Sequence, residues 1–86
     1  MIEKEIKDAM ENKKLIIGTK TVLKNLKNNK LKKVIYASNC PEKTKKDLNY
    51  YAQFSDIEIK EFKGTSLELG IVCGKPFNIL LLGILK

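Results

Sequence analysis

The sequence contains no arginine, no histidine and no tryptophan, and only two cysteines and two prolines. Without histidine, a cysteine or serine nucleophile lacks its commonest general base at neutral pH. Cys40 and Cys73 stand alone, without the CxxC spacing of zinc or redox sites. We therefore expect two reduced thiols, no disulfide framework, no metal and no other cofactor.

Long apolar runs are also missing. Residues 2–14 are mostly charged, and no window approaches the length of a membrane span. This pattern predicts no signal sequence and no contact with a membrane, and hence an intracellular protein. Of the 86 residues, 43% are apolar, which is enough for a small hydrophobic core, so we expect residues 1–86 to form a single domain.

The charge of the chain is strongly positive and unevenly placed. All 17 cationic side chains are lysines, against ten acidic side chains, which gives a net charge of +7. Residues 1–33 hold ten lysines and four acids, net +6, whereas residues 34–86 hold seven lysines and six acids, net +1. A basic N-terminal part fits a nucleic-acid partner, and it fits equally a solvated lysine-rich surface.

Apolar periodicity predicts four helices that alternate with four strands, which indicates an α/β layered domain. We expect helices at about residues 2–13, 19–29, 41–54 and 66–73, and strands at about residues 15–17, 31–37, 57–62 and 77–85. The second strand is a continuous apolar run and should lie near the sheet centre, whereas the third alternates and should be an edge strand. Phe54 is a candidate for the buried side of the third helix. Thr65 and Glu68 have the spacing of a capping box at the start of the fourth helix.

Three loops carry the polar and basic residues that suit a ligand: Gly18–Lys20, Ser38–Pro41 and Gly74–Phe77. In layered α/β domains, ligands gather where loops cluster at one end of the sheet. The order of residues along the chain does not establish that these three loops share an end. We treat their convergence as the hypothesis on which a common site depends.

The chemistry of these loops matches RNA. Backbone amides at Gly18, Thr19 and Lys20 open a helix and can hold phosphate oxygens. Asn39 can donate to and accept from a base edge, and Phe77 can stack on an unpaired base. Each residue also has a simpler interpretation, since Gly18 can serve a tight turn, Asn39 can cap the next helix and Phe77 can belong to the core.

Several motifs, in order along almost the whole chain, resemble one family. They lie at residues 18–24, 37–41, 50–52, 62–70 and 74–77. These stretches are similar to archaeal and eukaryotic large-subunit ribosomal protein thirty. That protein belongs to a superfamily of kink-turn RNA binders that includes ribosomal protein seven-A and the box C/D ribonucleoprotein core protein.

The resemblance implies a three-layer α/β/α sandwich around a small mixed four-stranded sheet. It also implies a non-enzymatic protein that binds kink-turn or internal-loop RNA, with ribosomal RNA and ribosomal or ribonucleoprotein subunits as partners. We expect it to be cytoplasmic and ribosome-associated, and monomeric when free. The implied RNA-binding residues are Gly18, Thr19, Lys20, Thr21, Lys24, Asn39, Lys75 and Phe77. In the seven-A branch, Asn-Glu occupies the positions of Lys20 and Thr21, so this sequence favours the branch of protein thirty.

The sequence also has features that suggest functions other than RNA binding. Residues 70–75 resemble a phosphate-binding loop, but three residues separate the glycines instead of four, and Pro76 replaces the hydroxyl that would bind magnesium. We reject that interpretation. Cys40 precedes a helix and lies near lysines, which favours a thiolate, so a thiol-dependent enzyme or redox sensor is the main alternative. A protein-interaction subunit that lost its RNA surface is a third possibility.

Overall fold

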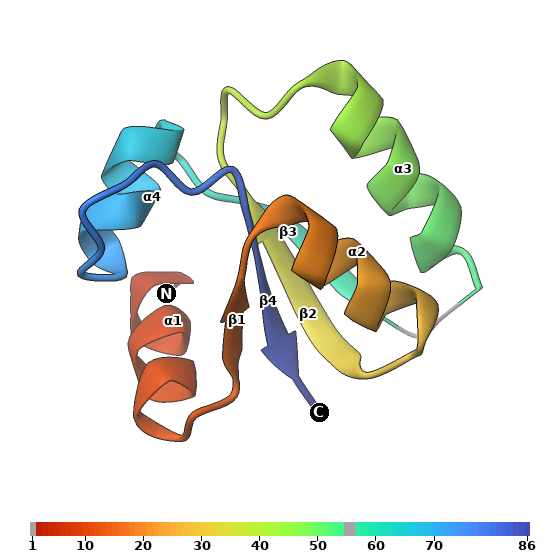
Figure 1. The fold of residues 1–86 in the computed structure, drawn as a ribbon, viewed down its shortest axis with the longest axis horizontal. Coiled ribbons are helices and arrows are strands. Elements are labelled where there is room, and N and C mark those ends of the chain that lie inside the picture. Colours follow the sequence, from red (N-terminus) through yellow and green to blue (C-terminus); the bar gives the residue numbers. More distant parts are fainter. Residues whose placement is uncertain (1, 55–56) are drawn as a thin grey trace.

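A computed structural model of the protein describes residues 2–54 and 57–86, in which helices and strands alternate as predicted (Figure 1). The elements are α1 (Ile2–Glu11), β1 (Leu15–Ile17), α2 (Thr19–Lys27), β2 (Leu31–Tyr36), α3 (Glu42–Ala52), β3 (Glu58–Glu61), α4 (Ser66–Val72) and β4 (Leu81–Leu85). The bounds of β1 and the first residue of α2 match the prediction. In the described residues, no helix has the length and apolar character needed to cross a membrane.

The four strands form one mixed sheet in the order β1-β4-β2-β3. β4 runs antiparallel to both β1 and β2, while β2 and β3 are parallel. This order confirms that β2 is an inner strand and β3 an edge strand. Tyr36, at the end of β2, lies opposite both Leu81, at the start of β4, and Glu61, at the end of β3. The segments that follow β1, β2 and β3 and the segment that precedes β4 therefore lie at the same end of the sheet.

Two hydrophobic cores lie on opposite faces of the sheet. One joins residues of α1 and α4, such as Ile6 and Leu69, to Ile35 of β2. The other joins residues of α2 and α3, such as Val22 and Leu48, to the neighbouring residue of β2, Val34. Adjacent strand residues point to opposite faces, so β2 is buried on both sides. Helices in pairs on the two faces make the predicted three-layer sandwich (Figure 1).

Two segments differ from the prediction. The last strand begins at Leu81 instead of Phe77, because the backbone before it contacts other elements: Ile79 N–H donates to Ser66 O at 3.0 Å, and Ala37 N–H donates to Leu80 O at 2.9 Å. Phe54, a candidate core residue, is 70% exposed because α3 ends at Ala52. Apolar composition alone therefore overestimated both the strand and the buried face of α3.

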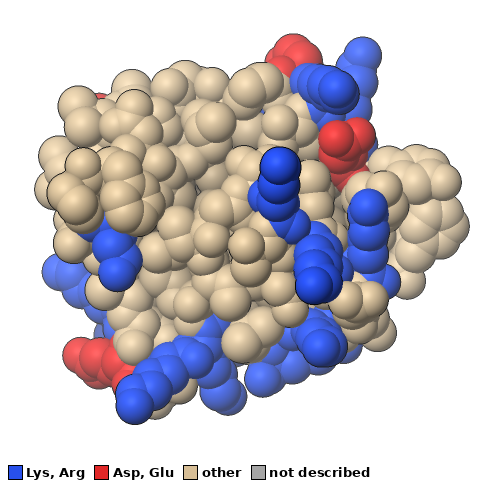
Figure 2. All heavy atoms as spheres, in the orientation of Figure 1, with Lys and Arg blue, Asp and Glu red and all other residues tan. Residues whose placement is uncertain are grey.

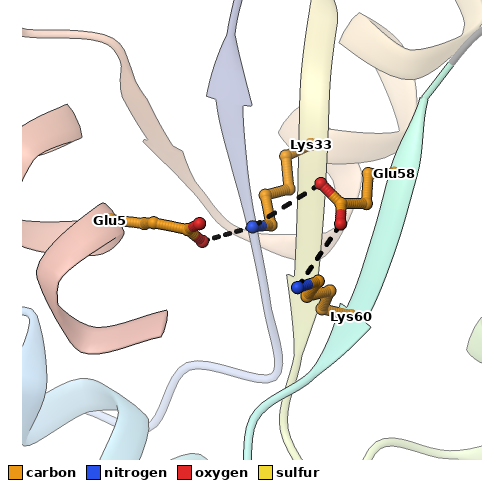
Figure 3. Close-up of polar contacts among 4 residues, drawn as sticks. All are labelled: Glu5, Lys33, Glu58 and Lys60. Atoms are coloured by element: carbon orange, nitrogen blue, oxygen red, sulfur yellow. Dashed lines mark hydrogen bonds and ion pairs between the residues drawn. The ribbon is translucent and has the colours of Figure 1, made fainter. Parts of the chain in front are cut away.

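A buried lysine links three elements at the end of the sheet away from the loops. The Lys33 ammonium bonds to Glu5 of α1 and lies 3.7 Å from Oε2 of Glu58 in β3. The other carboxylate oxygen of Glu58, Oε1, lies 3.4 Å from Lys60 Nζ (Figure 3). A register shift between Leu31 and Lys33 places the lysine on the face covered by α1. The Lys33 hydrogen bond is the main cause that lowers the pKa of Glu5.

Candidate nucleic-acid interface

Two of the three predicted loops, those after β1 and β2, lie at one end of the sheet together with the segment that leads from the third loop into β4. Gly18 N–H, directly after β1, donates to Leu81 O at 3.3 Å, and Ala37 N–H, directly after β2, donates to Leu80 O at 2.9 Å. Both acceptors lie where the loop after α4 enters β4. The loops after β1 and β2 are therefore tied to the start of β4, and in Figure 1 this junction lies at the upper end of the sheet. We call this end the rim.

The first part of the rim is the turn from β1 into α2. Gly18 has φ 109° and ψ 137°, in the region that favours glycine, and its carbonyl accepts Val22 N–H at 2.9 Å. No side chain caps this helix start. The first N–H groups of a helix lack partners within the helix, so they face the rim with partial positive charge. Thr19 is half-buried there, while Lys20 and Thr21 are exposed.

The side chain of Asn39, in the loop after β2, forms hydrogen bonds to another part of the protein. Its Oδ1 accepts Ser66 N–H at 2.9 Å, and its Nδ2 donates to Ser66 Oγ at 3.2 Å. The expectation that Asn39 could cap the following helix is wrong, because it holds the start of α4 and Pro41 occupies the cap position of α3. An asparagine amide has two N–H groups, so this arrangement leaves one for a ligand.

Lys75 and Phe77 lie in the loop after α4, which begins at the C-terminal end of that helix and returns along it to the rim. Lys75 does not reach the rim: it lines a hollow beside β1 with Met10, Lys13, Leu15 and Ile17. Lys75 and Phe77 are both exposed, Phe77 by 53%, so the alternative that Phe77 is a core residue is wrong. Lys75 N–H donates to Gly70 O at 2.9 Å. A Cβ at Gly70 would overlap the carbonyl of Phe77, so the missing side chain allows the loop to lie directly against α4. The glycine within the apolar pattern of α4 was a sequence signal for this close approach.

Positive charge continues from the rim along α2. This helix contains Lys20, Lys24 and Lys27 and no acidic residue. Figure 2 shows lysines gathered over α2, whereas the surface over α4 and the adjoining loop is mostly uncharged. Lys24 lies one turn beyond the rim on the outer side of the helix. The rim thus combines unpartnered backbone amides with lysines, and the exposed ring of Phe77 lies in the loop that leads to it.

The two cysteines do not provide a reactive site. Cys40 and Cys73 are both buried free thiols, and burial is the main cause that raises the pKa of each. The alternative based on Cys40 required a lowered pKa, and this direction is wrong because desolvation outweighs the effect of Lys45. Within residues 2–54 and 57–86, no group of three histidine, cysteine or acidic side chains could hold a metal ion.

The chain is similar to known proteins in sequence and in fold. Residues 1–86 match the model of the ribosomal protein L7Ae/L30e/S12e/Gadd45 family. The chain is 45% identical over 78 residues to large ribosomal subunit protein eL30 of Methanothermobacter thermautotrophicus, covering 91% of this chain and 80% of that protein. It is 38% identical over 84 residues to eL30 of Zea mays, covering 98% and 75% of the two chains.

Two solved structures are similar in fold. A Bacillus halodurans protein with unknown function has a TM-score of 0.83 and 25% identity, over 94% of this chain and 80% of that chain. The Giardia lamblia 15.5kD RNA binding protein has a TM-score of 0.81 at 17% identity, over 99% of this chain and 71% of that chain. At this identity the second likeness concerns the fold alone.

Proposed function

The chain belongs to the ribosomal protein L7Ae/L30e/S12e/Gadd45 family, and from that premise we propose that it is an RNA-binding protein that recognises a kink-turn or a related internal loop. Its similarity to eL30 proteins of archaea and a plant supports a role as a large-subunit ribosomal protein or a close paralogue. We propose residues 1–86 as one RNA-binding domain, monomeric when free, with ribosomal RNA as partner. It would act in the cytoplasm on the ribosome and without enzymatic activity.

The observation that carries the proposal is that the loops after β1 and β2 meet the segment entering β4 at one rim. The start of α2 supplies backbone amides for phosphate oxygens, and Lys20 and Lys24 add cationic contacts to the same RNA strand. The free N–H of Asn39 is available to a base edge, and the exposed ring of Phe77 to a bulged base. Gly18, Thr19, Thr21 and Lys75 complete the proposed contacts.

This rim needs little rearrangement to receive a bent backbone. Hydrogen bonds from Gly18 and Ala37 to the start of β4, and from Ser66 to Asn39, fix the loops relative to one another in the RNA-free chain. Such preorganisation lowers the entropic cost of binding. RNA that is already sharply bent should therefore bind more tightly than a straight duplex with the same flanking helices.

The test is a titration of the protein with two RNAs. One contains a kink-turn, and the other has the same flanking helices joined by continuous base pairs. We expect a saturable one-to-one complex with the kinked RNA and binding at least about a hundredfold weaker to the duplex, because backbone attraction alone gives dissociation constants of roughly 10⁻⁴–10⁻⁶ M. Equal affinity for both RNAs would contradict the proposal.

A further inference from the structure

An exposed aromatic cluster lies at the C-terminal end of α3, away from the rim. Tyr50 is 56% exposed and Phe54 is 70% exposed. The Tyr50 ring packs edge to face against Tyr51, at 5.2 Å between centroids, and against Phe54, at 5.4 Å. In Figure 2 an uncharged bulge stands at the right, over this end of α3, with lysines beside it. We call Tyr50, Tyr51 and Phe54 the aromatic cluster.

The row of lysines on α2 connects the aromatic cluster with the rim. Lys20, Lys24 and Lys27 follow one another by four and three residues, so they lie along one side of the helix. Lys20 belongs to the rim, and Lys27 Nζ lies 4.9 Å from the centroid of the Tyr51 ring. Since the helix rises about 1.5 Å per residue, the row spans roughly 10 Å.

A hollow of about 310 Å³ lies where the row ends, between the C-terminal ends of α2 and α3. It is lined by Leu26, Lys27, Asn29, Tyr51 and Phe54. Its lining contains a cation and two aromatic rings and no acidic side chain. A positively charged track that leads to exposed aromatic rings is the combination by which proteins hold single-stranded nucleic acid: lysines follow the backbone and bases stack on the rings.

We propose that RNA bound at the rim continues along the lysines of α2, and that an unpaired nucleotide flanking the kinked segment stacks on the aromatic cluster. This inference rests on the proposed function and adds a second contact to it. Lys27 neutralises a phosphate beside the stacked base, while Phe54 and Tyr50 provide the stacking surface. The contact should accept any of the four bases, because every base has a π face that can stack on an aromatic ring.

The experiment compares RNAs that differ only in an unpaired extension. A kink-turn RNA is prepared without extension, with about six uridines at its 5′ end, and with the same uridines at its 3′ end, a length within the range of single-strand sites on small domains. The two extended forms test both directions of the strand. We expect one of them to bind the full-length protein about fivefold or more tightly than the unextended RNA, the effect of stacking at least one base.

Variants assign that gain to the aromatic cluster. Phe54→Ala should remove most of the gain and leave the affinity for unextended RNA unchanged, whereas Phe54→Trp should keep it. Phe54→Leu should lose the gain, because leucine is apolar but cannot stack with a base. Ile71→Ala is the matched control, since Ile71 is 66% exposed on α4 in the opposite layer. Thermal melting of each variant checks that the fold is intact.

The outcomes separate the two proposals. No saturable complex with unextended RNA would overturn both. Binding of unextended RNA with no gain from either extension would overturn the stacking contact alone, as would a gain that Phe54→Ala retains. A gain that Phe54→Leu retains would overturn stacking and point to apolar docking instead. Photo-crosslinking from 4-thiouridine in the extension provides a second measurement, which should label Tyr50 or Phe54.

Discussion

Lys20 lies in the first turn of α2, whose backbone amides have no partners within the helix. If it contacts a phosphate, Lys20→Ala should weaken binding to all kink-turn RNAs by a similar factor. It should also reduce the slope of log K against log salt by about one unit, because one fewer counterion is released. Titrations at several salt concentrations measure the slope. Lys7→Ala, an exposed lysine on α1, should leave it unchanged, and an unaltered slope in Lys20→Ala would contradict the contact.

Substitution of Asn39 should have two separable effects, one on the stability of the protein and one on its affinity for RNA. Asn39→Ala removes the acceptor of Ser66 N–H and should cost about 1–3 kcal/mol of stability through the unsatisfied group. It should also cost about 1–3 kcal/mol of affinity and blur discrimination between loop sequences, with base contacts in duplex DNA as the guide. Thermal melting measures the first effect and titration of several RNAs the second. Ser66→Ala removes the acceptor of the other bond and serves as a comparison, and equal loss of affinity on every RNA would mean that Asn39 acts in the fold only.

At the scale of elements, the contact between α4 and the loop before β4 depends on Gly70. Alanine is intrinsically better than glycine in a helix by about 1 kcal/mol, so Gly70→Ala would stabilise an isolated helix. Here the added methyl group would overlap the Phe77 carbonyl. We therefore expect a net loss of about 1–3 kcal/mol in stability and a weaker RNA complex, because the loop must shift. Chemical denaturation and RNA titration measure both, and a variant that is more stable than the wild type would refute the contact.

The link between α1 and the sheet through Glu5 and Lys33 should make stability depend on pH. The folded state lowers the pKa of Glu5 below its ordinary value of 4.5. The stabilisation is therefore complete above that value and is lost as the pH falls through the lower, folded-state pKa. Glu5→Gln should destabilise the protein at pH 7 and have a smaller effect near pH 3. Urea unfolding at the two pH values tests this, with Glu3→Gln on the exposed side of α1 as the control.

At the scale of the whole molecule, the rim should be ordered before RNA binds. The amides of Ala37 and Ile79 bond across elements at 2.9 and 3.0 Å, so their hydrogens should exchange slowly in the RNA-free protein. The amide of Lys20, in the first turn of α2, should exchange fast and become protected on binding. Hydrogen exchange followed by NMR measures all three. Fast exchange at Ala37 and Ile79 would mean that the loops assemble only on the RNA.

Local signals in the sequence predicted most of the elements. The apolar run Leu15–Ile17, the glycine after it and the amphipathic pattern that follows place β1 and the start of α2 correctly, because each signal depends on neighbouring residues. Phe77–Leu80 was wrongly predicted as strand, since an apolar run does not distinguish a strand from a loop packed against a helix. The prediction that Phe54 is buried was wrong for a related reason: the helical spacing of apolar residues continues past the residue at which α3 ends.

By itself, the sequence determined the order of helices and strands, the two-sided burial of β2 and the absence of acidic residues from α2. Tertiary structure alone decided that the loops after β1 and β2 meet the segment entering β4 at one rim, that Asn39 bonds to Ser66, and that Phe77 is exposed. The physical reason is the direction of β4, which runs antiparallel to both β1 and β2 and so brings its own start to the ends of both strands. That pairing joins residues more than 40 positions apart, and no local pattern encodes it.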